Sequence, residues 1–228
     1  MVDERRIGRG VFLATVAGGL SSLWWGKAAW GAVSGVISPV AEAIQILPSK
    51  GWRIYTVASS MPVFEPATWR LKIGGLVDKP LELSYDELRA LPQVSQVSVF
   101  HCVTGWTVDG VHWRGVRFKD LLAAAGPQAG AHALEFVSAE QPYVDYLTLD
   151  QAMLPDVMLA WEMDGDPLLQ EHGAPVRVVI PEMYGYKNVK WVAEVNLVRM
   201  PDVGFWERPE NGSYDNDAWV GRSNGYTS

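Results

Sequence analysis

The sequence predicts an α+β fold with mixed β-sheets, a few short helices and long loops. Its 228 residues include 11 Trp, 22 Gly and 14 Pro, an aromatic and turn-rich composition that suits a β-rich domain better than a helical bundle. From Gly51 onward, short runs of alternating apolar and polar residues are separated by Pro, Gly and Asp. Strand, loop, helix and strand then follow one another along the chain.

The first elements are expected between residues 69 and 102. Residues 69–73 alternate between apolar and basic side chains, which is the period of a half-buried strand. Ser84–Glu87 is a capping box, because Ser84 can cap the first turn while Glu87 reaches back to it. A short helix should run from there to about Leu91, before Pro92. The alternation around Val97 then predicts a strand that leads into His101 and Cys102.

A loop rich in Gly and Trp is expected after Cys102, followed by a helix over residues 118–125 that Gly126 closes. Asp150 is expected to cap another short helix, and Asp164-Gly165 to form a turn. Further strands are predicted at 134–138, 157–162, 176–180 and 191–198. Residues 205–228 carry Trp206, Tyr214, Trp219 and Tyr226, which predicts an ordered tail packed on the body through its aromatic side chains.

Size, charge and cysteine count bound the function. A chain of this length with 48% hydrophobic residues can bury a full core, and we expect one globular body. The net charge of -7 argues against a nucleic-acid partner, which needs clustered Lys and Arg. The single cysteine, Cys102, excludes an intramolecular disulfide and a four-thiolate metal site.

The N-terminal segment differs from the rest. Arg5 and Arg6 precede Val11–Gly26, an uncharged run of about 16 residues, as in a twin-arginine export signal. The run is short for a membrane span, which needs roughly 20 residues, so a membrane anchor or a buried helix stays open beside a signal. We therefore assign residues 1–47 to a twin-arginine-like signal or anchor and 48–228 to the body. The expected location is the periplasm or cell envelope. If the N-terminal segment is not cleaved, it would anchor the protein to the inner membrane.

Cys102 is the first candidate functional residue. A lone cysteine is more often a small buried apolar residue than a ligand or nucleophile. Cys102, however, stands where a predicted strand meets a loop, the position at which a rigid scaffold presents reactive groups. A thiolate is also the soft donor that a high-valent, sulfur-coordinated metal accepts.

A second group of candidates lies downstream. Arg177, Lys187, Asn188 and Lys190 fall beside glycine-containing loops in a chain that is acidic overall. Arg binds phosphate through two parallel hydrogen bonds and Lys as a point charge, so these residues could hold an anionic cofactor. The alternative is that they are ordinary surface and strand-edge charges.

Four motifs carry a resemblance to a known family. They are Phe-His-Cys-Val-Thr-Gly-Trp at 100–106, Trp-Arg-Gly-Val at 113–116, His-Gly-Ala-Pro-Val-Arg at 172–177 and Tyr-Gly-Tyr-Lys-Asn-Val-Lys-Trp at 184–191. In this order and spacing, over about Gly51–Arg199, the chain resembles the oxidoreductase molybdopterin-binding domain. That family includes sulfite oxidases, eukaryotic assimilatory nitrate reductases and the catalytic subunit of the bacterial periplasmic methionine sulfoxide reductase. The resemblance implies a sulfite oxidase-type fold.

The resemblance also implies roles for seven residues. It makes Cys102 the catalytic residue and the ligand of one molybdenum, which molybdopterin holds through two dithiolene sulfurs. It makes Arg177, Asn188 and Lys190 contacts of the pterin or its phosphate, and His172 and Ser138 polar contacts of the pterin. Tyr55 falls in the first segment that contacts the cofactor. The implied activity is oxygen-atom transfer as molybdenum cycles between Mo(VI) and Mo(IV), with electrons from a haem or quinone-linked membrane partner.

The residues after Cys102 bear on the substrate. Sulfite oxidases carry arginines soon after the ligand cysteine to hold an oxyanion, whereas Val103–Trp106 follows here. We therefore expect a reductase of a small or protein-bound S-oxide or N-oxide, with a sulfite-oxidising dehydrogenase as the alternative. Thr104 stands where the methionine sulfoxide reductase tends to have an acidic residue, so the substrate itself is left open.

Two other classes of protein compete with this interpretation. In a thiol enzyme, Cys102 would be the nucleophile and His101, His112, His132 or His172 the base, although His101 would point to the opposite face of its strand. In an exported binding module the fold would persist without a cofactor, but such a module has no evident need for Cys102, Arg177 and Lys190 together. Metal content separates these alternatives. Trp106 and Trp113 either line the substrate entrance or pack against the core, and neither is taken as catalytic because aromatic residues in a turn-rich β domain are more often core.

Overall fold

The computed structural model describes residues 45–49 and 51–221, and all of these belong to the unit Ala43–Ser228. The predicted signal or anchor therefore lies outside the described residues except for 45–47, and so does Tyr226. Within the described ranges, no helix has the length and apolar character needed to cross a bilayer.

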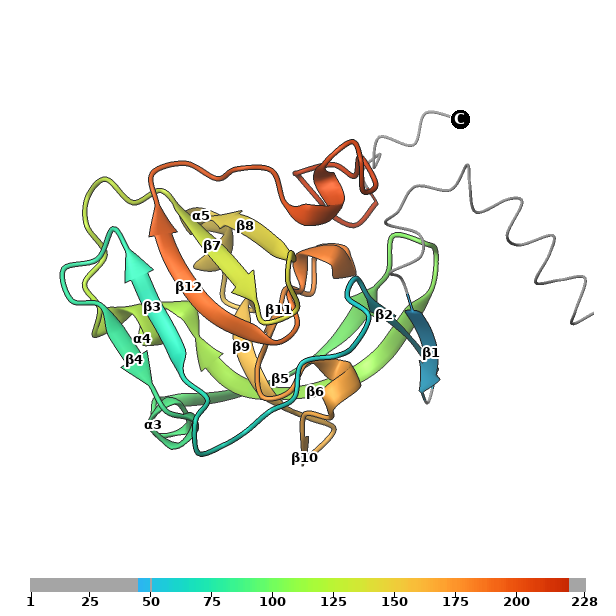
Figure 1. Cartoon of the computed structure of the whole chain (residues 1–228), viewed down its shortest axis with the longest axis horizontal. Helices are drawn as coiled ribbons and strands as arrows, with labels where there is room; N and C mark the ends of the chain where they lie inside the picture. Colours follow the sequence, from blue (N-terminus) through green and yellow to red (C-terminus); the bar gives the residue numbers. More distant parts are fainter. Residues whose placement is uncertain (1–44, 50, 222–228) are drawn as a thin grey trace, which may run out of the picture. The chain divides into compact units, whose positions relative to one another are not determined.

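The described residues form two five-stranded sheets and one hairpin (Figure 1). The first sheet is antiparallel and has the order β10 (Asp166–Pro167), β9 (Met158–Met163), β6 (Thr107–Arg117) and β5 (Gln93–His101), with β11 (Arg177–Val179) also paired to β9. The second has the order β4 (Leu81–Leu83), β3 (Leu71–Gly75), β12 (Val192–Val198), β7 (Ala133–Ser138) and β8 (Val144–Thr148). The hairpin joins β1 (Gln45–Ser49) to β2 (Trp52–Thr56).

The second sheet is mixed because β3 and β12 run parallel, side by side in Figure 1, while its other pairs are antiparallel. The helices in the described part of the chain are short: α3 (Tyr85–Arg89), α4 (Phe118–Ala123), α5 (Leu149–Ala152) and the 3-10 turns η1 (Gln170–His172), η2 (Gly185–Lys187) and η3 (Phe205–Glu207). The predicted α+β class, with mixed sheets and few short helices, is confirmed.

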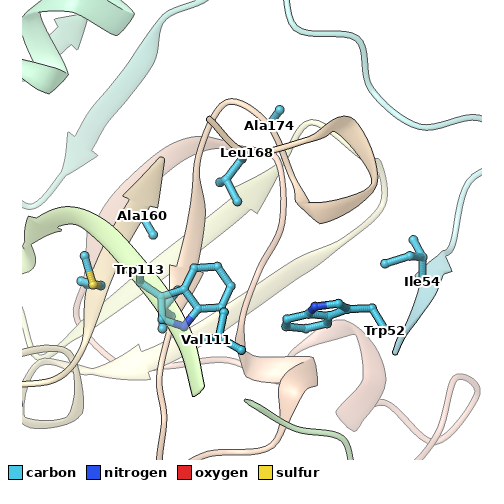
Figure 2. Packing of buried hydrophobic residues seen from close by; sticks show 9 residues of the cluster. Trp52, Ile54, Val111, Trp113, Ala160, Leu168 and Ala174 are labelled. Atoms are coloured by element: carbon cyan, nitrogen blue, oxygen red, sulfur yellow. The ribbon is translucent and has the colours of Figure 1, made fainter. Parts of the chain in front are cut away.

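A hydrophobic cluster joins the hairpin to the first sheet (Figure 2). Trp52 and Ile54 of β2 pack with Val111 and Trp113 of β6, and the Trp52 and Trp113 rings meet edge to face with centroids 6.3 Å apart. Because both indoles are almost fully buried, this contact fixes β2 against β6. The β2 strand is thereby held at the edge of the candidate site.

Several predicted elements match closely. The capping box of Ser84 and Glu87 is present, although the helix ends at Arg89, two residues before the expected end. The helix predicted over 118–125 covers Phe118–Ala123, and Gly126 follows in the left-handed region at φ +67°. Trp191 also has positive φ, so the final strand begins at Val192.

Two predictions about local structure were wrong. The loop expected after Cys102 is only a tight turn, and an eleven-residue strand, β6, follows it. The strand was not predicted because its glycines are typical of loops. Gly115 is needed here because it lies so close to β9 that an added Cβ would be 2.0 Å from the Leu159 carbonyl oxygen. The cap of α5 is Thr148 rather than Asp150, because the Thr148 hydroxyl accepts from the Gln151 amide while Asp150 lies inside the first turn.

Candidate functional site

One cavity of about 350 Å³ brings together all seven residues singled out from the sequence. Tyr55 comes from β2, Cys102 from the end of β5, Ser138 from the end of β7, His172 from η1 and Arg177 from β11. Asn188 and Lys190 come from the segment between η2 and β12. Elements from both sheets and from the hairpin therefore build one site out of residues far apart in the sequence.

Cys102 is presented by a tight turn. Its amide donates to the Trp106 carbonyl at 2.9 Å and its carbonyl accepts from the Gly105 amide at 3.0 Å, with Gly105 at φ +88°. The Cys102 Sγ lies 3.1 Å from the Thr104 hydroxyl, which in turn lies 3.5 Å from the Tyr55 hydroxyl. Among the described residues the thiol's hydrogen-bond partner is thus Thr104 and not a histidine.

Arg177 is a buried cation with no acidic partner among the described residues. Its side chain is 3% exposed, and no described carboxylate forms an ion pair with it. The guanidinium donates to the carbonyls of His172 and Asn188 at 3.2 and 3.4 Å and lies over the Phe100 and Trp113 rings. Burial lowers its pKa to about 10. Since a buried charge without a counterion costs several kcal/mol, roughly, this arrangement favours an anionic ligand.

Lys190 adds a second cation to the same cavity. Its Nζ donates to the carbonyls of Tyr55 at 2.7 Å and Glu171 at 3.3 Å, and lies 4.0 Å from the centre of the Trp191 ring. Burial, and then repulsion by Arg177, lower its pKa to about 7. An anion with several charges would stabilise both cations together.

His172 is buried and uncharged. Its Nδ1 has no hydrogen-bond partner in the described structure, and its ring meets the edge of Trp52 at 5.1 Å. Burial, and then the nearby charge of Arg177, lower its pKa to about 4. The imidazole is therefore neutral at physiological pH, with one ring nitrogen left for a ligand.

Ser138 and Asn188 hold the backbone of the site. The Ser138 hydroxyl donates to the Lys190 carbonyl at 2.8 Å and accepts from the Glu140 amide at 2.9 Å. The Asn188 side-chain oxygen accepts from the Ile180 amide at 2.8 Å, and its amide group donates to the Tyr184 carbonyl. Both side chains therefore fix the segment that carries Lys190.

Lys187, grouped with the other cations on sequence grounds, does not line the cavity. Its ammonium is buried in an ion cluster with Asp145, at 2.7 Å, and Glu207. The cluster joins η2 to β8 and to the C-terminal segment. Grouping Lys187 with the cations of the cavity by charge was therefore wrong, because its side chain is directed to β8 and the C-terminal segment.

Sequence reasoning missed other residues that line the cavity. The Glu140 carboxylate accepts from the Thr56 hydroxyl and from the Val57 amide at 2.8 Å, which ties the end of β2 to the turn after β7. No local pattern indicates this contact. Trp206 and Tyr214 also line the cavity, so the aromatic tail contributes to the site as well as to packing.

Comparison with known proteins identifies the family of the chain. The family model described as "Oxidoreductase molybdopterin binding domain" matches residues 58–206. The chain is 37% identical over 150 residues to the uncharacterized oxidoreductase YuiH of Bacillus subtilis, covering 65% of this chain and 75% of the relative. It is 29% identical over 195 residues to a sulfite oxidase of Arabidopsis thaliana, covering 68% and 50%.

The chain is also 33% identical over 153 residues to the protein-methionine-sulfoxide reductase catalytic subunit MsrP of Xanthomonas axonopodis, covering 60% and 47%. It thus spans about half the length of these last two relatives. In fold it is similar to the sulfane dehydrogenase SoxCD of Paracoccus pantotrophus, with a TM-score of 0.62 and 23% identity over 75% of this chain and 54% of that one. The chain therefore belongs to the oxidoreductase molybdopterin-binding domain family, and is a molybdopterin-binding oxidoreductase domain of the sulfite oxidase type.

Proposed function

We propose that the protein catalyses oxygen-atom transfer at a molybdenum cofactor held in the 350 Å³ cavity, and that it reduces an S-oxide. The observation that carries the proposal is the buried guanidinium of Arg177, which has no acidic partner in the described chain and shares a cavity with Lys190 and Cys102. A cofactor with an anionic phosphate and a thiolate-binding metal would pair with both cations and bind the Cys102 sulfur.

The residues present fit molybdopterin. Arg177 and Lys190 supply the positive charge that a phosphate requires, and the Nδ1 of neutral His172 is free to hydrogen-bond to a pterin. Tyr55, Ser138 and Asn188 complete the cofactor-binding set. The Cys102 thiolate is the protein's ligand for molybdenum and the catalytic residue. When bound, the cofactor supplies two-electron redox chemistry through which an oxygen atom passes between substrate and water.

The chain's own groups orient and enclose that chemistry. The turn at Cys102 fixes the direction of the sulfur, since its amide and carbonyl are both hydrogen-bonded. Thr104 places a hydroxyl 3.1 Å from the sulfur, where it can donate to the thiolate and stabilise its charge. Trp52, Phe100 and Trp106 line the cavity with apolar surface and so limit the entry of water.

An S-oxide is favoured over an oxyanion because Val103, Thr104 and Trp106, which line the cavity next to Cys102, are uncharged. A relative named as a protein-methionine-sulfoxide reductase catalytic subunit supports the same direction. The second candidate is a sulfite-oxidising dehydrogenase, favoured by exposed Arg53, which also lines the cavity. Assays of both reactions with artificial electron carriers separate the two: reduction of a sulfoxide without oxidation of sulfite supports the first.

We infer that the protein is exported folded to the periplasm or cell envelope and works as a monomer with a haem or quinone-linked electron-transfer partner. Arg5 and Arg6 before the apolar run support the twin-arginine route, which carries folded proteins and so accommodates prior cofactor insertion. Replacing both arginines by lysine should retain the protein in the cytoplasm. Export of that variant at the wild-type level would contradict the route.

Metal analysis tests the cofactor assignment. Protein from a host that makes the cofactor should contain about one molybdenum per chain and release a pterin on oxidation. Arg177→Met should lose most of the molybdenum and the pterin. Cys102→Ser should change the spectrum of the metal, because an oxygen replaces the sulfur ligand. Arg114→Met is the matched control, because Arg114 is half-exposed and pairs with Glu162 at 3.5 Å. Wild-type protein without molybdenum or pterin would overturn the proposal in favour of a cofactor-free binding module or a thiol enzyme.

A further inference from the structure

The C-terminal segment adds an aromatic wall to the cavity, formed by Trp206 and Tyr214. Their rings are tilted by 31° with centroids 6.2 Å apart, and Tyr214 packs in turn against Tyr186 at 5.0 Å. All three line the cavity that contains Cys102. The match to the family model ends at residue 206, so Tyr214 lies outside the matched region.

The wall is rigid. The Tyr214 amide donates to the Trp206 carbonyl at 3.1 Å, and three amides of residues 211–213 donate to the Arg208 carbonyl. Gly212 allows this close turn, since an added Cβ would lie 2.8 Å from the Trp206 carbonyl oxygen. Glu207 anchors the segment from below through its buried ion pair with Lys187. Two aromatic side chains on a hydrogen-bonded segment thus line the cavity.

The chemistry of these faces selects against bare anions. An aromatic face carries partial negative charge, which repels an oxyanion but packs well on hydrocarbon and on polarizable sulfur. The buried cations of the same cavity, Arg177 and Lys190, are engaged with backbone carbonyls and are assigned above to the cofactor's phosphate. The wall therefore suits the carbon substituents of a neutral oxide.

We propose that Trp206 and Tyr214 form a substrate subsite that selects neutral sulfoxides with a bulky apolar or aromatic substituent over small or anionic oxides. The proposal rests on the proposed function and specifies its substrate class. In the reaction, the substrate's sulfur is reduced by two electrons from a donor and its S–O bond breaks. The oxygen takes up two protons and leaves as water, so atoms and electrons balance.

The test compares phenyl methyl sulfoxide with dimethyl sulfoxide in the molybdenum-loaded protein, with reduced viologen as donor. The wild type should prefer the phenyl compound in kcat/KM. Trp206→Leu and Tyr214→Leu should each lower that preference by roughly 2- to 12-fold, mainly through the KM of the phenyl compound. Trp69→Leu is the control, because Trp69 packs edge to face on Phe64 and Tyr85 and does not line the cavity. It should leave the preference unchanged.

Calorimetry with the corresponding sulfones, which have the same substituents, gives a readout independent of turnover. Phenyl methyl sulfone should bind the wild type more tightly than dimethyl sulfone. Trp206→Leu and Tyr214→Leu should each reduce this difference in affinity. An unchanged preference in variants that retain molybdenum would overturn the proposal, and so would loss of molybdenum from them, since the wall would then hold the cofactor. If the loaded wild type reduces no sulfoxide, the proposed function fails instead, and sulfone selectivity alone decides the subsite.

Discussion

Replacing Lys187 by methionine removes the cation from a buried cluster that contains two carboxylates. Lys187, Asp145 and Glu207 are each at most 5% exposed, and the ammonium also donates to the Tyr146 carbonyl at 3.1 Å. Taking one partner out of a buried ion pair costs about 3–5 kcal/mol, because the remaining charge is left without a counterion. We expect Lys187→Met to lower the free energy of unfolding by that amount.

The pH dependence of this loss follows from Asp145. Burial, with the charge of Glu207, raises the pKa of its carboxyl to about 6 even with Lys187 beside it, and removing the ammonium raises it further. A raised folded-state pKa favours the protonated acid, so stability falls as pH rises from the unfolded value near 3.8 through the folded pKa. The deficit of the variant relative to wild type should therefore be smaller at pH 5 than at pH 8.

Urea unfolding at both pH values measures the effect on cofactor-free protein. The control is Lys72→Met, because Lys72 and Glu194 pair at 3.4 Å with side chains 59% and 35% exposed, and an exposed pair contributes at most about 1 kcal/mol. The reasoning is refuted if Lys187→Met costs no more than Lys72→Met, or if its deficit is as large at pH 5 as at pH 8.

Three further predictions concern the site and the sheet beneath it. In a redox titration, Thr104→Val should lower the midpoint potential of bound molybdenum by roughly a few tens of millivolts, because the hydroxyl 3.1 Å from the Cys102 sulfur stabilises the reduced, electron-rich metal. Thr104→Ser keeps the hydroxyl and should restore the wild-type potential. Gly115→Ala should lower unfolding stability by about 1–3 kcal/mol, since the new Cβ would meet the Leu159 carbonyl; a neutral result in urea would contradict the close approach. The His172 imidazole should show no NMR titration above pH 5, and a titration midpoint near 6.5 would show that the ring is solvated. Because its pKa is about 4 in the folded protein, the stability that neutral His172 contributes should be lost as pH falls from 6.5 toward 4.

Local patterns predicted the elements whose cause is local. The Ser84 capping box and the left-handed Gly126 were found because each needs only residues within one turn. β6 was missed because its glycines, read as loop residues, serve a close approach to β9 that only the folded sheet reveals. β8 was missed because Asp145 is buried in it, and that burial depends on Lys187, which lies 42 residues away.

The cofactor site was predictable to a different extent. The resemblance to the family implied seven site residues, and the structure gathers all of them in one cavity, although their individual contacts with the cofactor remain predictions. The charge pattern alone could not separate Lys190, which lines the cavity, from Lys187, which does not, whereas the resemblance named only Lys190. Nor could it place the aromatic tail, since the contact of Tyr214 with Tyr186 depends on how the segment after β12 turns back.

The parallel pairing of β3 with β12 has a consequence for the order of events in the cell. Ile73 lies beside Val195, and the cavity takes its lining from residues 52 to 214. Contacts between such distant parts of a chain form late and slowly, because the whole intervening loop must close first. A ribosome must therefore release nearly all of the described chain before a complete cavity exists, so cofactor capture follows synthesis and competes with the folding of the finished polypeptide.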